Sequence, residues 1–167
     1  MELRTERLVM RPLDRDTIRS IYDGIVDGPA LRGLEVPDDW PMEGLRSALP
    51  VMFNDLMDAP SSLGWHAWVI ADGATMMIMG DAGFKGPPND EGVVEIGFSM
   101  LPLHRGNGFA KEAVRALMDH AFTTGRVRTI VAECEEDNVI SRRTLLATGF
   151  EKRRTVRGRD YFERRSH

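Results

Sequence analysis

Apolar and polar residues alternate along this chain with two different periods, which predict strands and helices in a mixed order. Arg7–Arg11 alternates with the strand period and is predicted as a strand that Pro12 ends. The next segment has the helical period and is predicted as a helix that Asp14 caps and Gly24 ends. Its inward-facing positions are expected to be Ile18, Ile21, Tyr22 and Ile25.

A second helical stripe is interrupted by Pro50, which predicts a kink or a division into two short helices. Its apolar positions are Leu45, Leu49, Phe53 and Leu56. From residue 64 the strand period returns, and turn residues such as Asp72-Gly73 separate the apolar runs. These runs predict an antiparallel meander of three strands, Trp65–Ala71, Met76–Lys85 and Val93–Leu101.

The last third of the chain uses both periods. It predicts a long helix, a strand, a shorter helix that Gly149 ends, and a closing hairpin. The predicted bounds are Gly108–Phe122, Thr129–Glu135, Val139–Thr148, and the strand pair Phe150–Val156 and Asp160–Glu163. The complete order of elements indicates a mixed α/β (α+β) sheet rather than the regular alternation of a doubly wound fold.

Length and charge restrict the class of protein further. At 167 residues, 42% hydrophobic and 29% charged, the chain is expected to form one globular domain over residues 1–167. Its net charge of −4 argues against a protein that binds nucleic acid over its whole surface. The charge is uneven, because residues 151–167 carry +4 and residues 1–150 carry −8. An acidic body suits a cationic or amine substrate, although the charge alone is explained as well by surface acids that keep the protein in solution.

Several kinds of site have no support in the sequence. The one cysteine, Cys134, cannot form a disulfide within the chain, and its apolar surroundings favour a buried thiol over a nucleophile. Cysteine and histidine show no metal-ligand spacing, so no metal is expected. No segment approaches the roughly 20 apolar residues of a membrane span, and the N-terminus does not resemble a signal peptide. We therefore expect a cytoplasmic protein that does not enter a membrane.

The segment Leu103–Lys111 follows a predicted strand and opens a predicted helix. Gly106 and Gly108 allow a sharp turn that points several backbone N–H groups at one spot, where the helix dipole adds positive potential. With the nearby cations Arg105 and Lys111, this is the chemistry of a phosphate or pyrophosphate site. It is not a dinucleotide fingerprint, because Lys111 occupies the place of the third glycine, nor a nucleotide P-loop, because no Gly-Lys-Ser/Thr follows.

Residues Arg105–Ala110, Arg-Gly-Asn-Gly-Phe-Ala, resemble the Arg/Gln-x-x-Gly-x-Gly/Ala signature of the GCN5-related N-acetyltransferases (GNAT). Further segments are similar to the family in the same order, namely Leu3–Pro12, Val94–Met100, and Asp137–Ser141 followed by Gly149-Phe150. The first of these resembles the branch that acetylates the N-termini of ribosomal proteins. Together the segments cover nearly the whole chain.

The resemblance implies a mixed, mostly antiparallel sheet of about six or seven strands with about four helices, splayed between the fourth and fifth strands. It implies acetyl-CoA as cosubstrate, with the pantetheine arm in the splay and no metal. A backbone N–H at or beside Met100 would stabilise the oxyanion. The residues expected to bind the cofactor are Phe98, Ser99, Met100, Arg105, Gly106, Asn107, Gly108, Phe109, Ala110, Lys111 and Asn138.

Acyl transfer to an amine needs a base for the ammonium and is helped by an acid for the leaving thiolate. Glu95 is the candidate base, because it interrupts an apolar run and occupies the corresponding family position. Glu133 and Glu135 on the next strand are rivals. His66 is a weaker candidate that suits a packed position better.

Many relatives place a tyrosine acid where this chain has Leu145, so that acid is excluded here. Ser141, one turn earlier, resembles a serine of the N-terminal-acetylating branch and is the candidate acid, with Tyr161 as a remote alternative. Asn138 would cap the last helix and also help to hold pantetheine. A thiol with a pKa of about 8.5 is also a fair leaving group without any protein acid.

The leading hypothesis is an acetyl-CoA-dependent N-acetyltransferase acting on a primary amine, such as a protein N-terminus, in a ternary complex. Alternatives are acetylation of a small amine (a polyamine, an aminoglycoside or an amino-acid derivative) and acyl-CoA binding without turnover, which Leu145 motivates. The basic C-terminal hairpin also raises nucleic-acid binding, although its apolar alternation suggests packing. The protein is expected to be a monomer or a homodimer. An acceptor cleft could lie beside the acidic stretch 14–58, lined by Trp40, Trp65 and Trp68, although core packing is the favoured role for any single one of these tryptophans.

Overall fold

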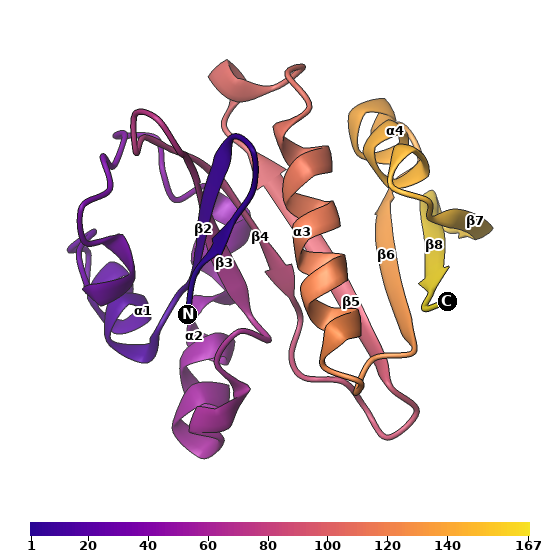
Figure 1. Cartoon of the computed structure of the whole chain (residues 1–167), viewed down its shortest axis with the longest axis horizontal. Coiled ribbons are helices and arrows are strands. Elements are labelled where there is room, and N and C mark those ends of the chain that lie inside the picture. The colour runs from indigo at the N-terminus through magenta and orange to yellow at the C-terminus, as the bar shows by residue number, and fades with distance from the viewer.

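The chain folds around one eight-stranded sheet in a computed structural model that describes residues 1–167 (Figure 1). The order across the sheet is β1-β2-β3-β4-β5-β6-β8-β7. The strands are β1 (Leu3–Arg4), β2 (Leu8–Pro12), β3 (Ala67–Asp72), β4 (Ile78–Phe84), β5 (Val93–Met100), β6 (Thr129–Glu135), β7 (Glu151–Val156) and β8 (Arg159–Arg165). The α-helices are α1 (Arg15–Tyr22), α2 (Glu43–Asp58), α3 (Phe109–Thr123) and α4 (Val139–Ala147). Short 3-10 helices are η1 (Pro29–Leu31), η2 (Pro60–Ser62) and η3 (Pro102–His104).

The sheet is divided between β5 and β6, its only parallel pair of strands. These strands pair over three residues, Val93–Glu95 with Thr129–Val131. Beyond Glu95, β5 continues to Met100 paired with β4 alone, so its other edge has no strand partner. This is the splay that the family resemblance implied between the fourth and fifth predicted strands. It frees backbone groups that need other partners.

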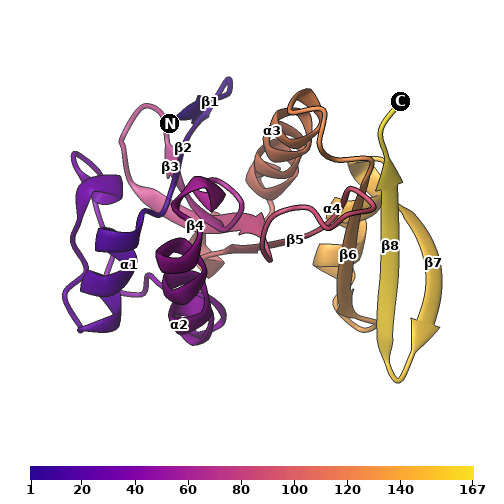
Figure 2. The ribbon, with the colours of Figure 1, turned by 90° about the horizontal axis from the view of Figure 1, so that it is seen from below.

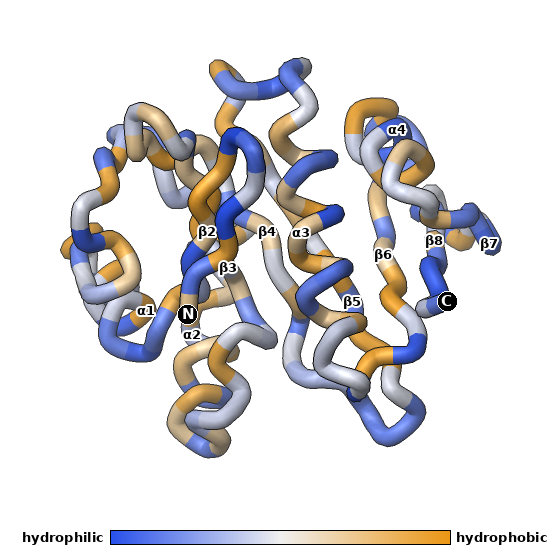
Figure 3. The backbone as a smooth tube through the Cα atoms, viewed as in Figure 1, coloured by the Kyte–Doolittle hydropathy of each residue, from blue (hydrophilic) through white to orange (hydrophobic).

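Helices cover both faces of the sheet (Figure 2). α3 lies on one face, where its buried side joins a cluster of 23 buried residues. Figure 3 shows hydrophobic and hydrophilic residues alternating along α3, as expected for a helix with one buried side. α1 and α2 lie on the opposite face over a second cluster of 13 buried residues. Alternation along β3 supplies both clusters, because Trp68 and Ile70 belong to the first and Val69 to the second.

The first helix is capped as expected but ends early. Asp14 accepts a hydrogen bond at Oδ1 from the Thr17 N–H, 2.9 Å away. α1 ends at Tyr22, and Gly24 follows with a φ of +88°. Tyr22 and Ile25 are each 63% exposed, so the prediction that they face the core was wrong. Apolar residues continue at the helical spacing beyond the last turn of α1 that packs against the sheet.

α2 runs without interruption from Glu43 to Asp58, so the predicted division at Pro50 was wrong. Pro50 faces solvent and has no N–H to donate to the carbonyl one turn back. Buried residues on both sides of the proline pack against the sheet and hold the helix together across this point. They are Leu45, Leu49, Met52 and Leu56.

The sheet has one strand more than expected, because β1 pairs with β2 through Leu3–Met10 and Arg4–Val9. The three-strand meander is confirmed as β3, β4 and β5. At the far edge, all six residues of β7 are exposed, and the strand pairs with β8 alone. All the helices fall short of the length and apolarity that crossing a bilayer requires.

Replacing Pro50 with alanine should stabilise α2, because alanine restores the missing hydrogen-bond donor. The expected gain in the free energy of unfolding is about 1–3 kcal/mol, measured by urea denaturation. Val51→Ala, at the adjacent exposed position, keeps the donor and should change stability by about 0.5 kcal/mol at most. A loss of stability in Pro50→Ala would show instead that the backbone here is adapted to proline.

Candidate active site

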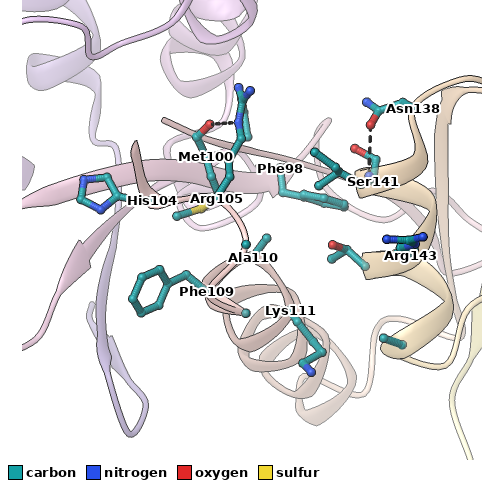
Figure 4. Close-up of a pocket in the computed structure, with 16 residues that line it drawn as sticks. Phe98, Met100, His104, Arg105, Phe109, Ala110, Lys111, Asn138, Ser141 and Arg143 are labelled. Atoms are coloured by element: carbon teal, nitrogen blue, oxygen red, sulfur yellow. Dashed lines mark hydrogen bonds between the residues drawn. The ribbon is translucent and has the colours of Figure 1, made fainter. Parts of the chain in front are cut away.

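A cavity of about 510 Å³ opens where the freed edge of β5, the start of α3 and one side of α4 meet (Figure 4). Its walls come from segments that are distant in the sequence. The lining residues are Phe98, Ser99, Met100, His104, Arg105, Gly106, Gly108, Phe109, Ala110, Lys111, Asn138, Ile140, Ser141, Arg143, Thr144 and Ala147.

The cavity brings together most of the residues expected from the sequence. Every expected cofactor-binding residue lines it except Asn107, and the candidate acid Ser141 lines it too. The Asn107 side chain turns back to donate a hydrogen bond to the Arg105 carbonyl at 3.2 Å. Glu95, the candidate base, is not among the lining residues. Helical spacing from Ser141 could have identified Thr144 and Ala147 as further members of the wall.

The glycine loop is built to expose backbone amides. Gly106 and Gly108 have φ values of +80° and +79°, which side-chain-bearing residues rarely adopt. Gly108 is the N-cap of α3, and no side chain caps that helix. The first N–H groups of α3 are therefore left for a ligand, with the positive end of the helix dipole behind them. The arrangement suits an anion such as a phosphate.

The N-terminal segment stabilises the glycine loop through contacts that were not predicted from the sequence. Glu112, in the first turn of α3, accepts hydrogen bonds from the Thr5 hydroxyl at 2.5 Å and from Arg7 Nε at 2.7 Å. Arg7 also donates to the Asn107 carbonyl at 2.9 Å and lies 4.4 Å from the centre of the Phe109 ring. Burial acts to raise the pKa of Glu112, but the hydrogen bonds from Thr5 and Arg7 outweigh it and hold that pKa below its usual value.

Three cations reach the cavity, and they differ in their partners. Arg105 donates from Nε to the Met100 carbonyl at 2.9 Å and so satisfies one backbone group beside the open edge of β5. Lys111 and Arg143 line the cavity, and no carboxylate lies within 4.0 Å of either. Unpaired cations on the wall of a cavity favour an anionic ligand.

The start of α4 supplies the polar side of the cavity. Asn138 caps the helix by accepting a hydrogen bond at Oδ1 from the Ser141 N–H at 3.1 Å, which confirms the predicted cap. Its side-chain amide hydrogens remain free to donate to a ligand. Figure 4 shows Ser141 and Arg143 on α4, on the opposite side of the cavity from the start of α3. Leu145 is buried in the core, so the position of the family tyrosine points away from the site.

Glu95 lies on the face of the sheet that carries α1 and α2, in an ion pair with Lys85. The rivals Glu133 and Glu135 on β6 form ion pairs with Arg159 at 3.1 and 2.5 Å. Each of these carboxylates therefore already has a cation, and the role of Glu95 as a base stays a prediction.

His66 is buried, with Nε2 3.3 Å from the Ser62 hydroxyl and 3.9 Å from the Asp55 carboxylate. Burial lowers the pKa of His66, despite the opposing effect of Asp55. A neutral, packed imidazole away from the cavity fits a structural role.

Asp81, in the middle of β4, was not predicted as a site residue from the sequence. It is 8% exposed and lies opposite Ser99 of β5 in the antiparallel pair. Trp40 Nε1 donates a hydrogen bond to Asp81 Oδ2 at 3.2 Å. Burial raises the pKa of Asp81 to about 6, and the bond from Trp40 limits that rise. An aspartate inside the otherwise apolar and glycine-containing run Ile78–Phe84 was the available signal.

The three tryptophans are buried in the core, and Cys134 is the buried thiol that the sequence predicts. Trp65 and Trp68 are buried in the cluster on the α3 side, where Trp68 contacts His120 with ring centres 5.4 Å apart. Of the three tryptophans, Trp40 alone packs on the side of α1 and α2. Cys134 is buried, and burial raises the pKa of its thiol, which is the state of an unreactive cysteine.

Part of the basic C-terminal hairpin is held in ion pairs within the protein. Lys152 and Arg142 contact the fully buried Asp160 at 2.9 and 3.0 Å, and Arg165 binds Glu163 at 2.6 Å. Asp160 and Glu163 are already counted in the net charge of +4, so only the pairing of Arg159 with Glu133 and Glu135 of β6 offsets part of that charge.

Comparison with known proteins agrees with this architecture. The profile of the acetyltransferase (GNAT) domain family matches residues 7–151. The uncharacterized N-acetyltransferase YjdG of Bacillus subtilis (strain 168) is 34% identical over 118 residues, which cover 71% of this chain and 70% of YjdG. RimL, a ribosomal L7/L12 alpha-N-protein acetyltransferase solved in complex with coenzyme A, has a TM-score of 0.67 at 16% identity, covering 99% of this chain and 98% of its own. MccE, a microcin C7 self immunity acetyltransferase solved with acetyl-CoA and AMP, has a TM-score of 0.62 at 16% identity, covering 97% and 94%.

The chain therefore belongs to the GNAT acetyltransferase family and is an N-acetyltransferase. The two solved structures confirm the fold, a mostly antiparallel open sheet flanked by four α-helices.

Gly108→Val should abolish binding of CoA, because a β-branched residue cannot keep the loop conformation that presents the amides. Gly125→Val is the matched control, since Gly125 also has a positive φ, of +70°, and lies outside the cavity. Both variants should lose about 1–2 kcal/mol of stability, but only Gly108→Val should lose CoA in calorimetry. Equal CoA affinity in the two variants would contradict the role assigned to the loop.

Proposed function

We propose that this protein transfers the acetyl group of acetyl-CoA to a primary amine by direct attack within a ternary complex. The observation that carries the proposal is the position of an uncapped helix N-terminus beside an open strand edge, in one cavity. The helix end suits the pyrophosphate of CoA, and the strand edge suits its pantetheine arm. An extended, amide-containing chain can bond such an edge as another strand would.

The residues of the cavity fit CoA in charge as well as shape. Backbone amides of Gly106–Ala110 would bind the pyrophosphate, with Lys111 and Arg143 contributing positive charge. Phe98–Met100 would lie along the pantetheine arm, and Asn138 has amide hydrogens free to donate to it. RimL and MccE, which share the fold, were solved with CoA and acetyl-CoA respectively.

The same walls supply groups for the chemistry. A backbone N–H at or beside Met100 would stabilise the oxyanion that forms at the acetyl carbonyl. Ser141, on the opposite wall, would donate a proton or a hydrogen bond to the departing sulfur. Glu95 is the base expected from the sequence, and its ion pair with Lys85 would have to open for that role.

A protein N-terminus is the acceptor that we favour. The segment Leu3–Pro12 resembles the ribosomal-protein acetylating branch, and RimL has the same fold. The acidic stretch 14–58 forms α1, α2 and the loop between them, which cover the face of the sheet opposite α3. A cationic terminus would approach that face.

The test is release of free thiol from acetyl-CoA in the presence of peptides, polyamines and aminoglycosides, with mass spectrometry of the product. We expect thiol release only with an amine present and fastest with peptide N-termini. CoA binding without acetylation of any amine in the panel would instead identify a non-catalytic acyl-CoA-binding protein.

Ser141→Ala should lower kcat by about 100-fold, the lower end of the range for a general acid, because a thiolate is a fair leaving group unaided. Its dissociation constant for CoA should stay close to that of the unaltered protein. Ser47→Ala, on the exposed side of α2, is the control for loss of a serine hydroxyl. An unchanged kcat in Ser141→Ala would remove this residue from the mechanism.

Arg143→Gln should raise the dissociation constant of CoA about tenfold, the effect of losing one charge-assisted hydrogen bond to a phosphate. Calorimetry at two salt concentrations measures it, and the loss should shrink at high salt. Arg157→Gln, which removes an exposed arginine of the last hairpin, is the charge-matched control. A similar affinity for all three proteins would show that Arg143 does not contact the ligand.

A further inference from the structure

Asp81 is a buried acid that the proposed roles leave unused, although it stands next to the reaction site. It pairs with Ser99 across β4 and β5, and Ser99 is part of the cavity wall. Directly opposed residues in an antiparallel pair have Cβ atoms about 4.5–5.5 Å apart. Asp81 is therefore within one side-chain length of the strand segment along which the thioester would lie.

The space beside Asp81 lies on the face of the sheet away from α3. Gly97 and Ser99 point to that face, because Ile96 and Met100 point into the α3-side cluster. A Cβ added at Gly97 would meet no atom within 4 Å, so open space adjoins β5 at this point. The loop before α2 reaches the same place, where the Ser99 hydroxyl lies 4.0 Å from Met42 Sδ. An acceptor could thus reach the strand edge from this side.

The carboxyl group of Asp81 is held at one oxygen and free at the other. Oδ2 accepts the hydrogen bond from Trp40. Oδ1 has no hydrogen-bond partner in the protein, and it is not fully buried. No lysine or arginine lies within 4.0 Å, in contrast to Glu95 and Glu133, which have Lys85 and Arg159. A buried carboxylate without a cation is costly, and an ammonium ion would provide the missing charge.

We propose that Asp81 receives the ammonium group of the acceptor and takes a proton from it, so that the neutral nitrogen can attack the acetyl carbon. The proposal rests on the acetyl transfer proposed above. Nitrogen forms a bond to the acetyl carbon, the carbon–sulfur bond breaks with its electron pair on sulfur, and the second proton of the attacking nitrogen goes to the thiolate. Asp81 then returns its proton to solvent. Trp40 is a positioning residue, because it acts on the acceptor through Asp81.

The ionisation of Asp81 suits this role. With its pKa raised to about 6 by burial, the group is mostly ionised at neutral pH and is a stronger base than an exposed aspartate. Facing it are Val69 from β3, Ser99 from β5 and Trp40 from the loop, none of them charged. Met42, which contacts Ser99, is also uncharged. Of the ionisable groups on the surrounding elements, Glu95 binds Lys85, Asp55 lies beside His66, and Arg46 donates to the Pro41 carbonyl. Asp38, Asp39 and Glu43 are exposed to solvent. Because the ionised form is required, kcat/KM should fall as the pH drops through about 6.

The experiment measures the pH dependence of kcat/KM in the full-length protein, using the acceptor found by the thiol-release assay. Asp81→Asn should lower kcat/KM by about 100-fold or more and remove the decline near pH 6, while binding CoA as before. Trp40→Phe removes the donor and should move the decline to higher pH, because the Trp40 hydrogen bond keeps the pKa of Asp81 down. Glu95→Gln should retain the decline of kcat/KM near pH 6, whatever the value of kcat/KM in this variant at neutral pH. Asp119→Asn, an exposed aspartate on α3, controls for the loss of one charge.

The outcomes separate this proposal from the proposed function. If the unaltered protein releases thiol, and Asp81→Asn retains both the value of kcat/KM and its decline near pH 6, the role of Asp81 is overturned and acetyl transfer stands. The same holds if Glu95→Gln removes the decline, or if Trp40→Phe leaves it in place. If the unaltered protein binds CoA but acetylates no amine, both proposals fail together. Should Asp81→Asn not fold, Trp40→Phe and Glu95→Gln still decide.

Discussion

The structure depends on one constraint, the parting of β5 from β6 after three paired residues. Peptide groups on a freed strand edge cannot stay buried without hydrogen-bond partners. Arg105 satisfies one of them, the Met100 carbonyl, from the loop that follows the strand. The cavity lies along the same segment of β5, so the gap in the sheet and the cavity are one feature. A fully paired sheet would be more regular but would have nowhere to hold an extended ligand.

The same strand separates two chemical environments. On the side of α3, the site presents backbone amides and cations, which suit the phosphates of a donor. On the side of α1 and α2, it presents carboxylates, which suit an amine. Ser99 takes part in both, since it lines the cavity and contacts Met42 on the other side. Reactants of opposite charge can therefore meet at β5 without competing for the same groups.

Much of this could be predicted from the sequence, for physical reasons. The glycine loop, the Asn138 cap and the meander depend on local rules, and each is found where those rules place it. Helix ends were less predictable, because the apolar period of α1 continues past Tyr22 and tertiary packing keeps α2 intact through Pro50.

Long-range partners could not be derived from the sequence. The lysine beside Glu95 and the tryptophan that bonds Asp81 come from segments that only the fold brings together. Asp81 itself carries a visible signal, an acid in an apolar strand, but the sequence cannot say which neighbour holds it. Trp65 and Trp68 pack in the core on the α3 side, which the sequence could not distinguish from the acceptor side, since a strand signal does not say which side of the sheet each residue takes.

The contacts of Thr5 and Arg7 with Glu112 join residues more than 100 positions apart. Contacts of such sequence separation form late, because the intervening chain must be ordered first. The glycine loop at the start of α3 would then reach its final shape only once the N-terminal segment has packed against it. A chain in which the N-terminal segment is missing or not yet folded would contain every residue proposed to bind acetyl-CoA and would still bind it poorly. Binding of the ligand would therefore distinguish fully folded molecules from partly folded ones.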